Sequence, residues 1–424
     1  MRIYIKTFGC SANRVESEII RRMLEDRGYE ISSSPYEADL LIVNTCTVRG
    51  ETDLKVINYL KSIKKKTIVT GCMASSQPAL IAKYSPSSSI ISLKCIPMIL
   101  EAIERERTIC LEGDFFLNPI PYINGVKATI LIARGCLGNC SYCIVRIAKG
   151  KLRSISPKII MDNLIHAVNL GAREIRLSAQ DTGVYGFDIG TNIVDLLKSL
   201  IRLSGDFIIR LGMFKPSSIV KDLISIYKSE KIYKFAHIPV QSGSNFILKK
   251  MNRGYTVEDF KQNINILRSE FPNMSIFTDV IVGFPGEEES DFEETCKLIS
   301  EVNPDKTHVS RFSPRPHTPA AAMPQISEEI KKRRSKILND IVKELQMKRN
   351  ENWIGRSVEA LVVDSYVKGG VIARTMEYKS IAIPNETPSI IGRRFEIIIE
   401  DATPYYLIGK IIRRIQVEEH KPPS

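Results

Sequence analysis

Short apolar runs alternate with amphipathic stretches in the first part of the chain. A run of hydrophobic residues four to eight long indicates a buried strand, and apolar positions spaced three to four apart indicate a helix. The pattern predicts strands at 3–8, 40–43 and 67–70 and helices at 14–28 and 52–64. Short apolar strands joined by helices favour a parallel, doubly wound sheet over residues 1–115.

The middle of the chain repeats the strand, loop and helix pattern about six times. The predicted strands lie at 128–133, 174–177, 207–211, 235–238, 276–282 and 307–310, and the helices between them at 157–170, 192–203, 217–229, 256–270 and 287–302. Six successive units of this kind indicate a full or partial parallel α/β barrel. Ligands of such barrels bind at the carboxyl ends of the strands.

A charged helix is predicted at 327–350, and a small all-β domain follows it. Short β-type runs between Val358 and Val417 are separated by turn signals such as Lys368-Gly-Gly370 and Pro384-Asn385. We therefore expect three domains, at 1–115, 120–350 and 351–418.

Composition excludes several classes of protein. The chain has 424 residues, of which 43% are hydrophobic and 25% charged, as in ordinary globular proteins. The absence of an apolar run of 18 residues predicts no membrane span, and the polar-interrupted N-terminus predicts a cytoplasmic protein. A net charge of +12 makes a polyanionic partner plausible. Part of this excess lies in 328–350, which holds eight basic and four acidic residues.

Three cysteines each follow a predicted strand of the N-terminal sheet. They are Cys10, Cys46 and Cys72. Because parallel strands bring their carboxyl ends to one edge of the sheet, these side chains should converge there and form a ligand set. The alternative is that all three are buried small hydrophobic residues.

Three further cysteines lie on one loop after the first barrel strand. The run Cys136-Leu-Gly-Asn-Cys140-Ser-Tyr-Cys143 has the spacing C-x3-C-x2-C. Three thiolates on a tight loop can hold three irons of a [4Fe–4S] cluster and leave the fourth iron without a protein ligand, whereas electron-transfer ferredoxins supply a fourth cysteine. Structural zinc is the alternative, but it requires four protein ligands. Cys95, Cys110 and Cys296 fit neither set and are predicted to be structural thiols.

The Cys136–Cys143 spacing resembles that of radical S-adenosylmethionine (SAM) enzymes, which have a partial (β/α)6 barrel. This resemblance implies a cluster held by Cys136, Cys140 and Cys143 that binds and cleaves SAM. The runs Thr7-Phe-Gly-Cys10, Asn44-Thr-Cys-Thr-Val48 and Thr70-Gly-Cys-Met73 are similar to the flavodoxin-like N-terminal domain of methylthiotransferases. That similarity implies a second, auxiliary [4Fe–4S] cluster on Cys10, Cys46 and Cys72. The C-terminal part resembles the TRAM module, a small tRNA-binding barrel.

Other runs most resemble the archaeal and eukaryotic tRNA subgroup of methylthiotransferases. They are Asp181-Thr-Gly-Val-Tyr-Gly186, His237-Ile-Pro-Val-Gln-Ser-Gly243 and Arg315-Pro-His-Thr-Pro-Ala320. The subgroup adds a methylthio group to C2 of N6-threonylcarbamoyladenosine at tRNA position 37. Alternatives within the family are isopentenyladenosine in tRNA and a ribosomal protein. His317 departs from the pattern, since relatives usually have glycine there.

The resemblance also implies cofactor contacts in the barrel. Tyr142 corresponds to an aromatic residue near the adenine, and Ser178, Gln180 and Asp181 to a loop near the amino group. Arg210 and Gln241 correspond to contacts with the carboxylate and ribose, and Gly283 to a residue beside the adenine. Strand packing or loop capping is the alternative for each of these positions.

The expected partners are tRNA, an electron donor and a sulfur source, the last two of unknown identity. Phosphate contacts are predicted from Lys331-Lys-Arg-Arg-Ser-Lys336, although a solvated helix face is equally compatible with that run. In the TRAM-like region they are predicted from Arg393-Arg394 and Arg413-Arg414, with Tyr405 or Tyr406 as stacking residues. Other classes of function remain open, namely a non-catalytic iron–sulfur tRNA-binding protein and a zinc-stapled RNA-binding scaffold.

Overall fold

The computed structural model describes residues 1–48, 50–115, 119–216 and 220–416. The chain divides into two compact units, each assembled from separate segments. The first comprises Met1–Tyr122, Ala133–Ile155 and Ser313–Ala322, and the second Ile123–Ile132, Ser156–Phe312 and Met323–Ser424. The cysteine loop at 136–143 therefore belongs to the same unit as the N-terminal sheet.

A six-stranded parallel sheet forms the centre of the first unit, as the sequence predicts. Its order is β2-β1-β3-β4-β5-β6, from β1 (Arg2–Thr7), β2 (Glu30–Ile31), β3 (Leu40–Thr45), β4 (Lys66–Gly71), β5 (Ser89–Ile91) and β6 (Ile109–Cys110). Strands β2, β5 and β6 were not predicted, because two or three residues are too few to show a period.

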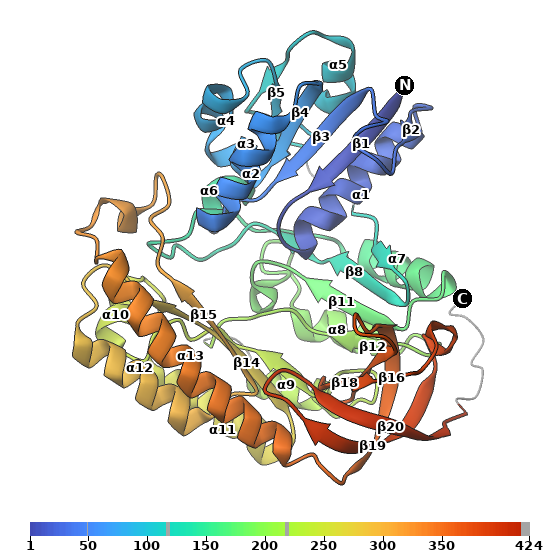
Figure 1. Ribbon diagram of the computed structural model, residues 1–424, viewed down its shortest axis with the longest axis vertical. Coiled ribbons are helices and arrows are strands. Elements are labelled where there is room, and N and C mark those ends of the chain that lie inside the picture. Colours follow the sequence, from blue (N-terminus) through green and yellow to red (C-terminus); the bar gives the residue numbers. More distant parts are fainter. Residues whose placement is uncertain (49, 116–118, 217–219, 417–424) are drawn as a thin grey trace. The chain divides into compact units, whose positions relative to one another are not determined.

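Helices cover the sheet of the first unit. Residues of α2 (Gly50–Ser62), α3 (Cys72–Ser76) and α4 (Pro78–Tyr84) form one apolar cluster with β3, β4 and β5. Figure 1 shows α1 (Ser11–Glu25) on the other side of the sheet from α2 and α4. The unit also contains α5 (Met98–Glu104), η1 (Leu93–Cys95), and the short β9 (Ala133–Arg134), β10 (Arg153–Ser154), α6 (Val145–Lys149) and η3 (Pro319–Ala322).

The six barrel strands of the second unit confirm the predicted α/β barrel. They are β8 (Lys127–Leu131), β11 (Glu174–Ser178), β12 (Ile208–Arg210), β13 (Phe235–His237), β14 (Ser275–Val282) and β15 (Lys306–Arg311). They form two sheets, β12-β11-β8-β7, which includes β7 (Tyr122–Asn124), and β13-β14-β15. A parallel bridge between Ile209 and Ile232 links β12 to the segment before β13 and so joins the two sheets. In the described residues β7 and β15 remain unpaired edges, so the barrel is partial.

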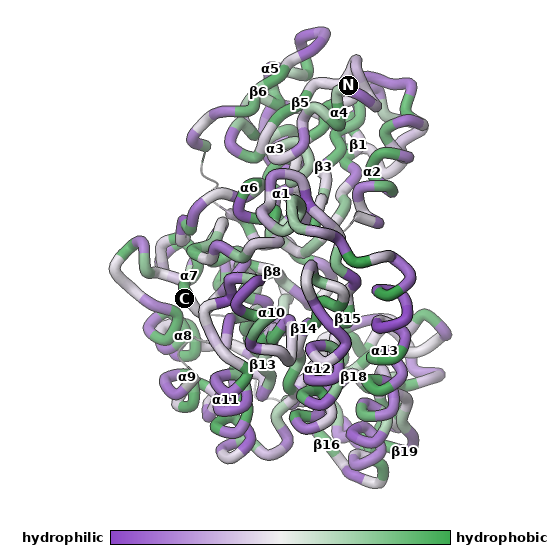
Figure 2. The backbone as a smooth tube through the Cα atoms, turned by 90° about the vertical axis from the view of Figure 1, so that its left-hand side faces the viewer, coloured by the Kyte–Doolittle hydropathy of each residue, from purple (hydrophilic) through white to green (hydrophobic). Residues whose placement is uncertain are grey.

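Burial distinguishes the two faces of the barrel strands. On β14, Ile276, Thr278 and Val280 are fully buried, whereas Phe277, Asp279 and Ile281 are half-buried. Since side chains alternate along a strand, the half-buried set faces the barrel interior and the buried set faces the helices. The outer helices are α7 (Pro157–Asn169), α8 (Ile193–Ile201), α9 (Val220–Tyr227), α10 (Asn245–Lys250), α11 (Val257–Glu270) and α12 (Glu289–Val302), with η2 (Thr182–Val184) in a loop. Hydrophobic and hydrophilic positions alternate along the helical tubes in Figure 2, as expected for helices with one buried face. The first residues of the helix predicted at 217–229, 217–219, lie outside the described part of the chain.

The C-terminal segment forms the predicted all-β domain, a closed five-stranded barrel. Its order is β16-β17-β18-β20-β19, from β16 (Ser357–Ser365), β17 (Val371–Thr375), β18 (Ser380–Ile383), β19 (Arg394–Ala402) and β20 (Leu407–Arg414), with η4 (Pro388–Ile390) between strands. Trp353, which follows α13 (Glu328–Glu351), is buried in its core. Val417 and residue 418 lie outside the described residues.

This small barrel packs on the α/β barrel within the second unit. Tyr378, in the turn between β17 and β18, shares an apolar cluster with Ile208, Tyr233 and Phe235. The Lys234 N–H donates to the Met376 carbonyl at 2.7 Å. Lys379 pairs with the buried Asp305 at 2.7 Å, and Arg394 with Asp206 at 2.7 Å. Arg394 therefore has a structural ion pair, which corrects its prediction as an RNA contact.

Candidate active site

The Cys136–Cys143 loop is held in a tight turn between β9 and α6. Gly135 has φ +77°, and a Cβ there would lie 2.0 Å from the Lys151 carbonyl oxygen, so the position requires glycine. The Cys136 N–H donates to the Gly150 carbonyl at 3.3 Å. Arg146 donates to the carbonyls of Leu137 and Gly138, each at 3.1 Å. The chain therefore brings three thiols together on one clamped loop.

The surroundings of this loop fit a bound iron–sulfur cluster. The Gly138 N–H donates to Cys136 Sγ at 3.2 Å, a contact that stabilises a thiolate. Burial raises the pKa of Cys143, and the nearby Cys140 and Cys136 raise it further. Each thiol therefore disfavours the ionisation of the others. A positively charged metal centre that binds all three thiolates would offset this repulsion.

Cys10, Cys46 and Cys72 meet at the carboxyl edge of the sheet, as the strand pattern predicts. Cys10 follows β1, Cys46 follows β3 and Cys72 begins α3 directly after β4. The Asn13 Oδ1 accepts from Cys10 Sγ at 3.3 Å and from Cys72 Sγ at 4.0 Å, so one amide lies between two of the thiols. The structure thus gathers this set from three separate loops.

Glycine makes the close approach of two of these loops feasible. Gly9 has φ +105°, and a Cβ there would lie 2.5 Å from Cys46 Cβ and 2.8 Å from Cys46 Sγ. Any larger residue would push the Cys10 loop away from Cys46. Gly9 therefore permits the close approach to Cys46, and Cys10 supplies the thiol.

A buried ion pair lies beside the second set of thiols. Lys149 Nζ lies 2.5 Å from Glu16 Oε1, and the two side chains are 3% and 1% exposed. Burial lowers the pKa of Lys149, but the attraction of Cys72, Glu16 and Cys10 outweighs it, and the pKa lies above its ordinary value. Burial raises the pKa of Cys72 to about 12, an effect that Lys149 opposes. Lys149 is thus a fixed positive charge next to thiols that bind metal only as thiolates.

The same lysine connects the two cysteine sets. It ends α6, six residues after Cys143, while Glu16 lies on α1, six residues after Cys10. Helix α6 also packs against α3, which begins at Cys72. Both thiol sets therefore belong to one packed unit. The sequence showed neither Lys149 nor Glu16 as site residues, since a single lysine after a cysteine loop carries no pattern.

The segment at 313–322 contacts both cysteine loops. Arg315 donates to Asp53 Oδ2 at 2.6 Å and to the Thr47 carbonyl, one residue after Cys46, at 3.3 Å. The Ala320 N–H donates to the Ser141 carbonyl, next to Tyr142, at 2.9 Å. His317 lies in this segment, exposed and with φ +63°, which is the backbone region that glycine adopts most readily.

The two kinds of metal centre that the cysteines could hold differ in how their ligands are arranged. Among the described residues, no three of His, Cys, Asp and Glu are gathered closely enough to hold one ion. Ligands of one zinc lie about 2.3 Å from the metal and hence close to each other, whereas a cubane distributes three thiolates over three irons.

The predicted cofactor residues of the barrel lie at or near the carboxyl ends of its strands. Ser178 ends β11, and Asp181 caps the turn after it by accepting from the Gly183 N–H at 3.1 Å and the Lys215 N–H at 3.4 Å. The other carboxylate oxygen of Asp181 is buried and accepts no hydrogen bond from the described residues. Burial raises the pKa of Asp181. This oxygen fits a cationic ligand group such as an ammonium.

The structure indicates different roles for Gln241 and Gly283. Gln241 has φ +74°, a strained conformation that is unusual for a residue with a side chain and common at ligand sites. A Cβ on Gly283 would lie 2.3 Å from Lys331 Cγ, so this glycine accommodates α13. Gly283 therefore has a packing role, and a cofactor contact there stays a prediction. Tyr142 is half-buried in the first unit, and Gln180 half-buried in the second.

Two predictions about charged and sulfur side chains are wrong. Lys331 and Arg334 are buried, and Arg334 pairs with Glu287 at 2.7 Å, because α13 packs on α12 and brings these cations against its acidic end. They are not available to phosphate, whereas Lys332, Arg333 and Lys336 are exposed. Cys95 and Cys110 form a disulfide, since η1 follows β5 and β5 pairs with β6, a short-range contact that the sequence spacing did not show.

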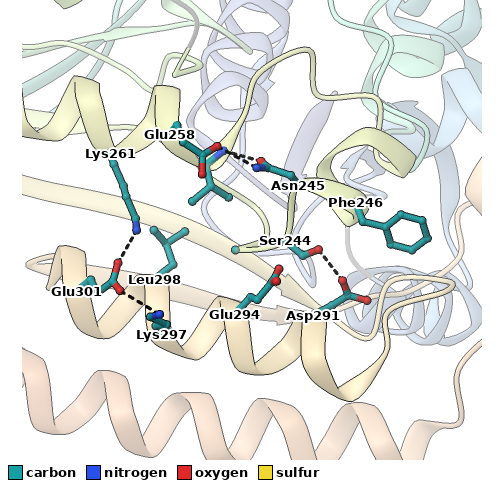
Figure 3. Close-up of a pocket in the computed structure, with 12 residues that line it drawn as sticks. Ser244, Asn245, Phe246, Glu258, Lys261, Asp291, Glu294, Lys297, Leu298 and Glu301 are labelled. Carbon is teal, nitrogen blue, oxygen red and sulfur yellow. Dashed lines mark hydrogen bonds and ion pairs between the residues drawn. The ribbon is translucent and has the colours of Figure 1, made fainter.

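A surface pocket lies among helices α10, α11 and α12, away from the inner face of the barrel (Figure 3). Its volume is about 420 Å³. Glu301 pairs there with Lys261 and Lys297, and Asp291 accepts from Ser244. Its charged groups are largely engaged with one another, so it is not a convincing ligand site.

Comparison with protein families matches three parts of the chain. Residues 2–92 match an uncharacterized protein family, UPF0004, residues 130–299 the radical SAM superfamily, and residues 351–412 the TRAM domain. Among solved structures, the chain resembles the radical SAM methyltransferase TsrM from Kitasatospora setae, with a TM-score of 0.56, 13% identity and coverage of 76% of this chain and 74% of that one. At that identity the likeness shows the fold. The fold and the cysteine loop define a radical SAM protein, and SAM and a [4Fe–4S] cluster are the cofactors that this superfamily implies.

Similar sequences give the family. A "Probable threonylcarbamoyladenosine tRNA methylthiotransferase" of Pyrococcus horikoshii is 39% identical over 97% of this chain and 100% of its own. The human "Threonylcarbamoyladenosine tRNA methylthiotransferase" is 32% identical over 98% of this chain and 75% of its own. A "tRNA-2-methylthio-N(6)-dimethylallyladenosine synthase" of Natranaerobius thermophilus is 34% identical over 97% and 96%. The chain belongs to the radical SAM tRNA methylthiotransferase family. No helix in the described residues is long and apolar enough to cross a membrane.

Proposed function

We propose that this protein adds a methylthio group to C2 of N6-threonylcarbamoyladenosine at position 37 of tRNA. The observation that carries the proposal is the packing of two three-cysteine sets in one unit of a chain that belongs to this family. The relatives with the higher identities bear the threonylcarbamoyladenosine name. The runner-up is the isopentenyl-type base, which the 34% identical relative supports.

C2 of adenine is an aromatic C–H position that no side-chain base can deprotonate near neutral pH. Bound clusters would supply the electron for SAM cleavage and an open iron for a sulfur ligand. The chain's own residues do the remaining work. Cys136, Cys140 and Cys143 would hold one cluster, and Cys10, Cys46 and Cys72 the auxiliary one. Arg146 fixes the first loop, and Gly9 and Asn13 let the second set assemble.

Lys149 would stabilise the charge state of the auxiliary site, whereas Glu16 holds Lys149 in place and itself opposes negative charge on Cys72. A [4Fe–4S] site with three thiolates is anionic overall, and the buried Lys149 ammonium next to Cys72 offsets that charge in a dry environment where it is not screened by water. Asp181, with one buried carboxylate oxygen that accepts no hydrogen bond, would accept from the cofactor's ammonium group. Ser178 and Gln180, at the end of β11, and Gln241, after β13, would complete its binding, with Tyr142 beside the adenine.

The binding of tRNA would combine the TRAM barrel with exposed cations. Tyr405 is 70% exposed, and Arg393, Arg413 and Arg414 are exposed near it in sequence. Stacking on exposed aromatic rings and contact with phosphates suit a single-stranded anticodon loop. We further propose a cytoplasmic location and reliance on a separate electron donor and sulfur source.

The experiment uses oxygen-free, reconstituted protein, a reductant, sulfide and methyl-deuterated SAM. Deuterium should appear in a methylthio group on the nucleoside from position 37, and 5′-deoxyadenosine should accumulate. SAM cleavage without any labelled nucleoside would indicate a different acceptor. Iron-containing protein that neither cleaves SAM nor labels tRNA would favour the non-catalytic binding protein.

A further inference from the structure

The inner face of the α/β barrel carries more positive than negative charge. Arg176 on β11, Arg210 on β12 and Lys306 on β15 lie on this face, and Arg374 of the small barrel lies beside them. Glu174 is the carboxylate that contacts this group directly. Its oxygens pair with Arg176 at 2.5 Å and with Arg374 at 3.8 Å.

Arg210 is near Glu174 but makes no direct ion pair with it. Its guanidinium lies over the rings of Phe235 and Tyr378, at 4.7 and 5.5 Å from their centroids. Its Nε is buried without a hydrogen-bond partner, and within the described residues the guanidinium makes no ion pair. Burial lowers the pKa of Arg210, and the neighbouring Arg176 and Arg374 lower it further, although Tyr378 and Glu174 oppose them. The desolvation of a half-buried guanidinium costs free energy unless an anion pairs with it.

Lys306 supports the same conclusion from the opposite sheet. It lies 5.7 Å from the centroid of Phe277 and makes no ion pair with the described residues. Burial and the nearby Arg374 lower its pKa. Two inner-face cations therefore make no ion pair within the described part of the chain.

The strand register places Arg210 deeper than the predicted cofactor residues. Arg210 pairs with Arg176, whereas Ser178 lies two residues further along β11, at its carboxyl end. At a rise of about 3.3 Å per residue, Arg210 is about 6.6 Å below Ser178 along the strand. A group that reaches Arg210 must project from the carboxyl edge into the barrel.

We propose that Arg210 binds the carboxylate of the threonyl group on the substrate base, and so selects the threonylcarbamoyl base over the isopentenyl base. This inference rests on the proposed function. The threonyl substituent is a chain that ends in a carboxylate, and a guanidinium fixed against two rings binds a carboxylate with defined geometry. The isopentenyl group has no charge and would leave Arg210 unpaired. The inference departs from the resemblance, which implies a contact of Arg210 with the cofactor's carboxylate.

The test compares three synthetic anticodon stem-loops that carry threonylcarbamoyladenosine, its methyl ester or plain adenosine at position 37. Binding to the reconstituted full-length protein is measured by fluorescence anisotropy. We expect the wild type to bind the free acid at least tenfold more tightly than the ester, which loses the negative charge and gains one methyl group. This comparison does not depend on the folding of any variant.

Variants then assign the effect to Arg210. Arg210→Gln should reduce the preference for the free acid over the ester at least tenfold, and Arg210→Lys should retain part of it. Arg202→Gln, which removes an exposed arginine after α8, should keep the wild-type preference. Equal preference in Arg210→Gln and wild type would overturn the inference. So would a raised KM for SAM in tRNA-free cleavage by Arg210→Gln, since that result assigns Arg210 to the cofactor. If wild type labels no threonylcarbamoyl tRNA, the proposed function itself fails.

Discussion

The Nζ of Lys149 lies 2.5 Å from the carboxylate of Glu16, and both side chains are almost completely buried. The two residues come from α6, after one cysteine loop, and α1, after another. The pair therefore connects the two thiol sets. The second Glu16 oxygen is buried without a hydrogen-bond partner among the described residues, and Arg134 lies close enough to attract this carboxylate.

Removal of the Lys149 charge should destabilise the first unit. Lys149→Met leaves Glu16 buried without its cation, which costs about 3–5 kcal/mol for a buried pair. Urea denaturation of the iron-free protein measures the loss. Lys151→Met, at an exposed lysine two residues later, should change stability by less than about 0.5 kcal/mol.

The double variant Lys149→Met/Glu16→Gln should recover most of that loss, since neither charge is then buried alone. A single variant as stable as the wild type would show that the pair is not tightly formed in solution.

The pH dependence of stability should report on Asp305, which lies between Lys379 and Arg349. Burial raises the pKa of Asp305, but these two cations outweigh it, and the pKa lies below its ordinary value. A lowered carboxyl pKa adds stability that is complete above the unfolded value, about 3.9, and is lost as the pH falls through the folded value. Thermal unfolding of Asp305→Asn should be destabilised at pH 7, and its difference from the wild type should shrink below about pH 4. A difference that stays constant to pH 3 would contradict this assignment.

Iron analysis should assign the two thiol sets. The triple variant Cys10→Ala/Cys46→Ala/Cys72→Ala should retain about half of the wild-type iron after reconstitution, because each set holds one of two equal clusters. Cys136→Ala/Cys140→Ala/Cys143→Ala should retain the other half and lose SAM cleavage. Cys296→Ala is the matched control and should keep all the iron, since Cys296 lies on α12 in the second unit. A triple variant of the N-terminal set with full iron content would remove the auxiliary cluster from the account.

Exposed and buried cations of α13 should behave differently. Arg333→Glu, at an exposed position, should weaken tRNA binding and reduce its dependence on salt, as expected when a phosphate contact is lost. Arg334→Gln should instead destabilise the protein by about 3–5 kcal/mol, because it leaves Glu287 buried and unpaired. Filter binding at two salt concentrations and thermal unfolding separate the effects. Unchanged binding by Arg333→Glu would exclude this helix face from the RNA contact.

Sequence pattern predicted the architecture well because most of its elements are long and periodic. Strand β14 and helix α11 each fall within a residue or two of their predicted bounds. The convergence of Cys10, Cys46 and Cys72 followed from strand topology alone. Strands of two or three residues, such as β6, carry no period and were missed.

The supporting residues of the site could not be predicted in this way. Lys149 pairs with Glu16, and Arg315 with Asp53, through contacts between distant segments. The sequence pattern gives no sign of either pairing, although Arg315 lies in a run that resembles the family. For the same reason Arg334 was taken for an exposed cation, although the packing of α13 buries it. Which charges are buried is decided by tertiary packing, and a single sequence shows only the type of side chain.

The most direct test of the account is a competition between substrates. Reconstituted protein is incubated with SAM and an equal mixture of two tRNAs that carry threonylcarbamoyladenosine or isopentenyladenosine at position 37, and the nucleosides are quantified by mass spectrometry. The account predicts that the 2-methylthio derivative of the threonylcarbamoyl base dominates. A dominant 2-methylthio isopentenyl product would contradict it.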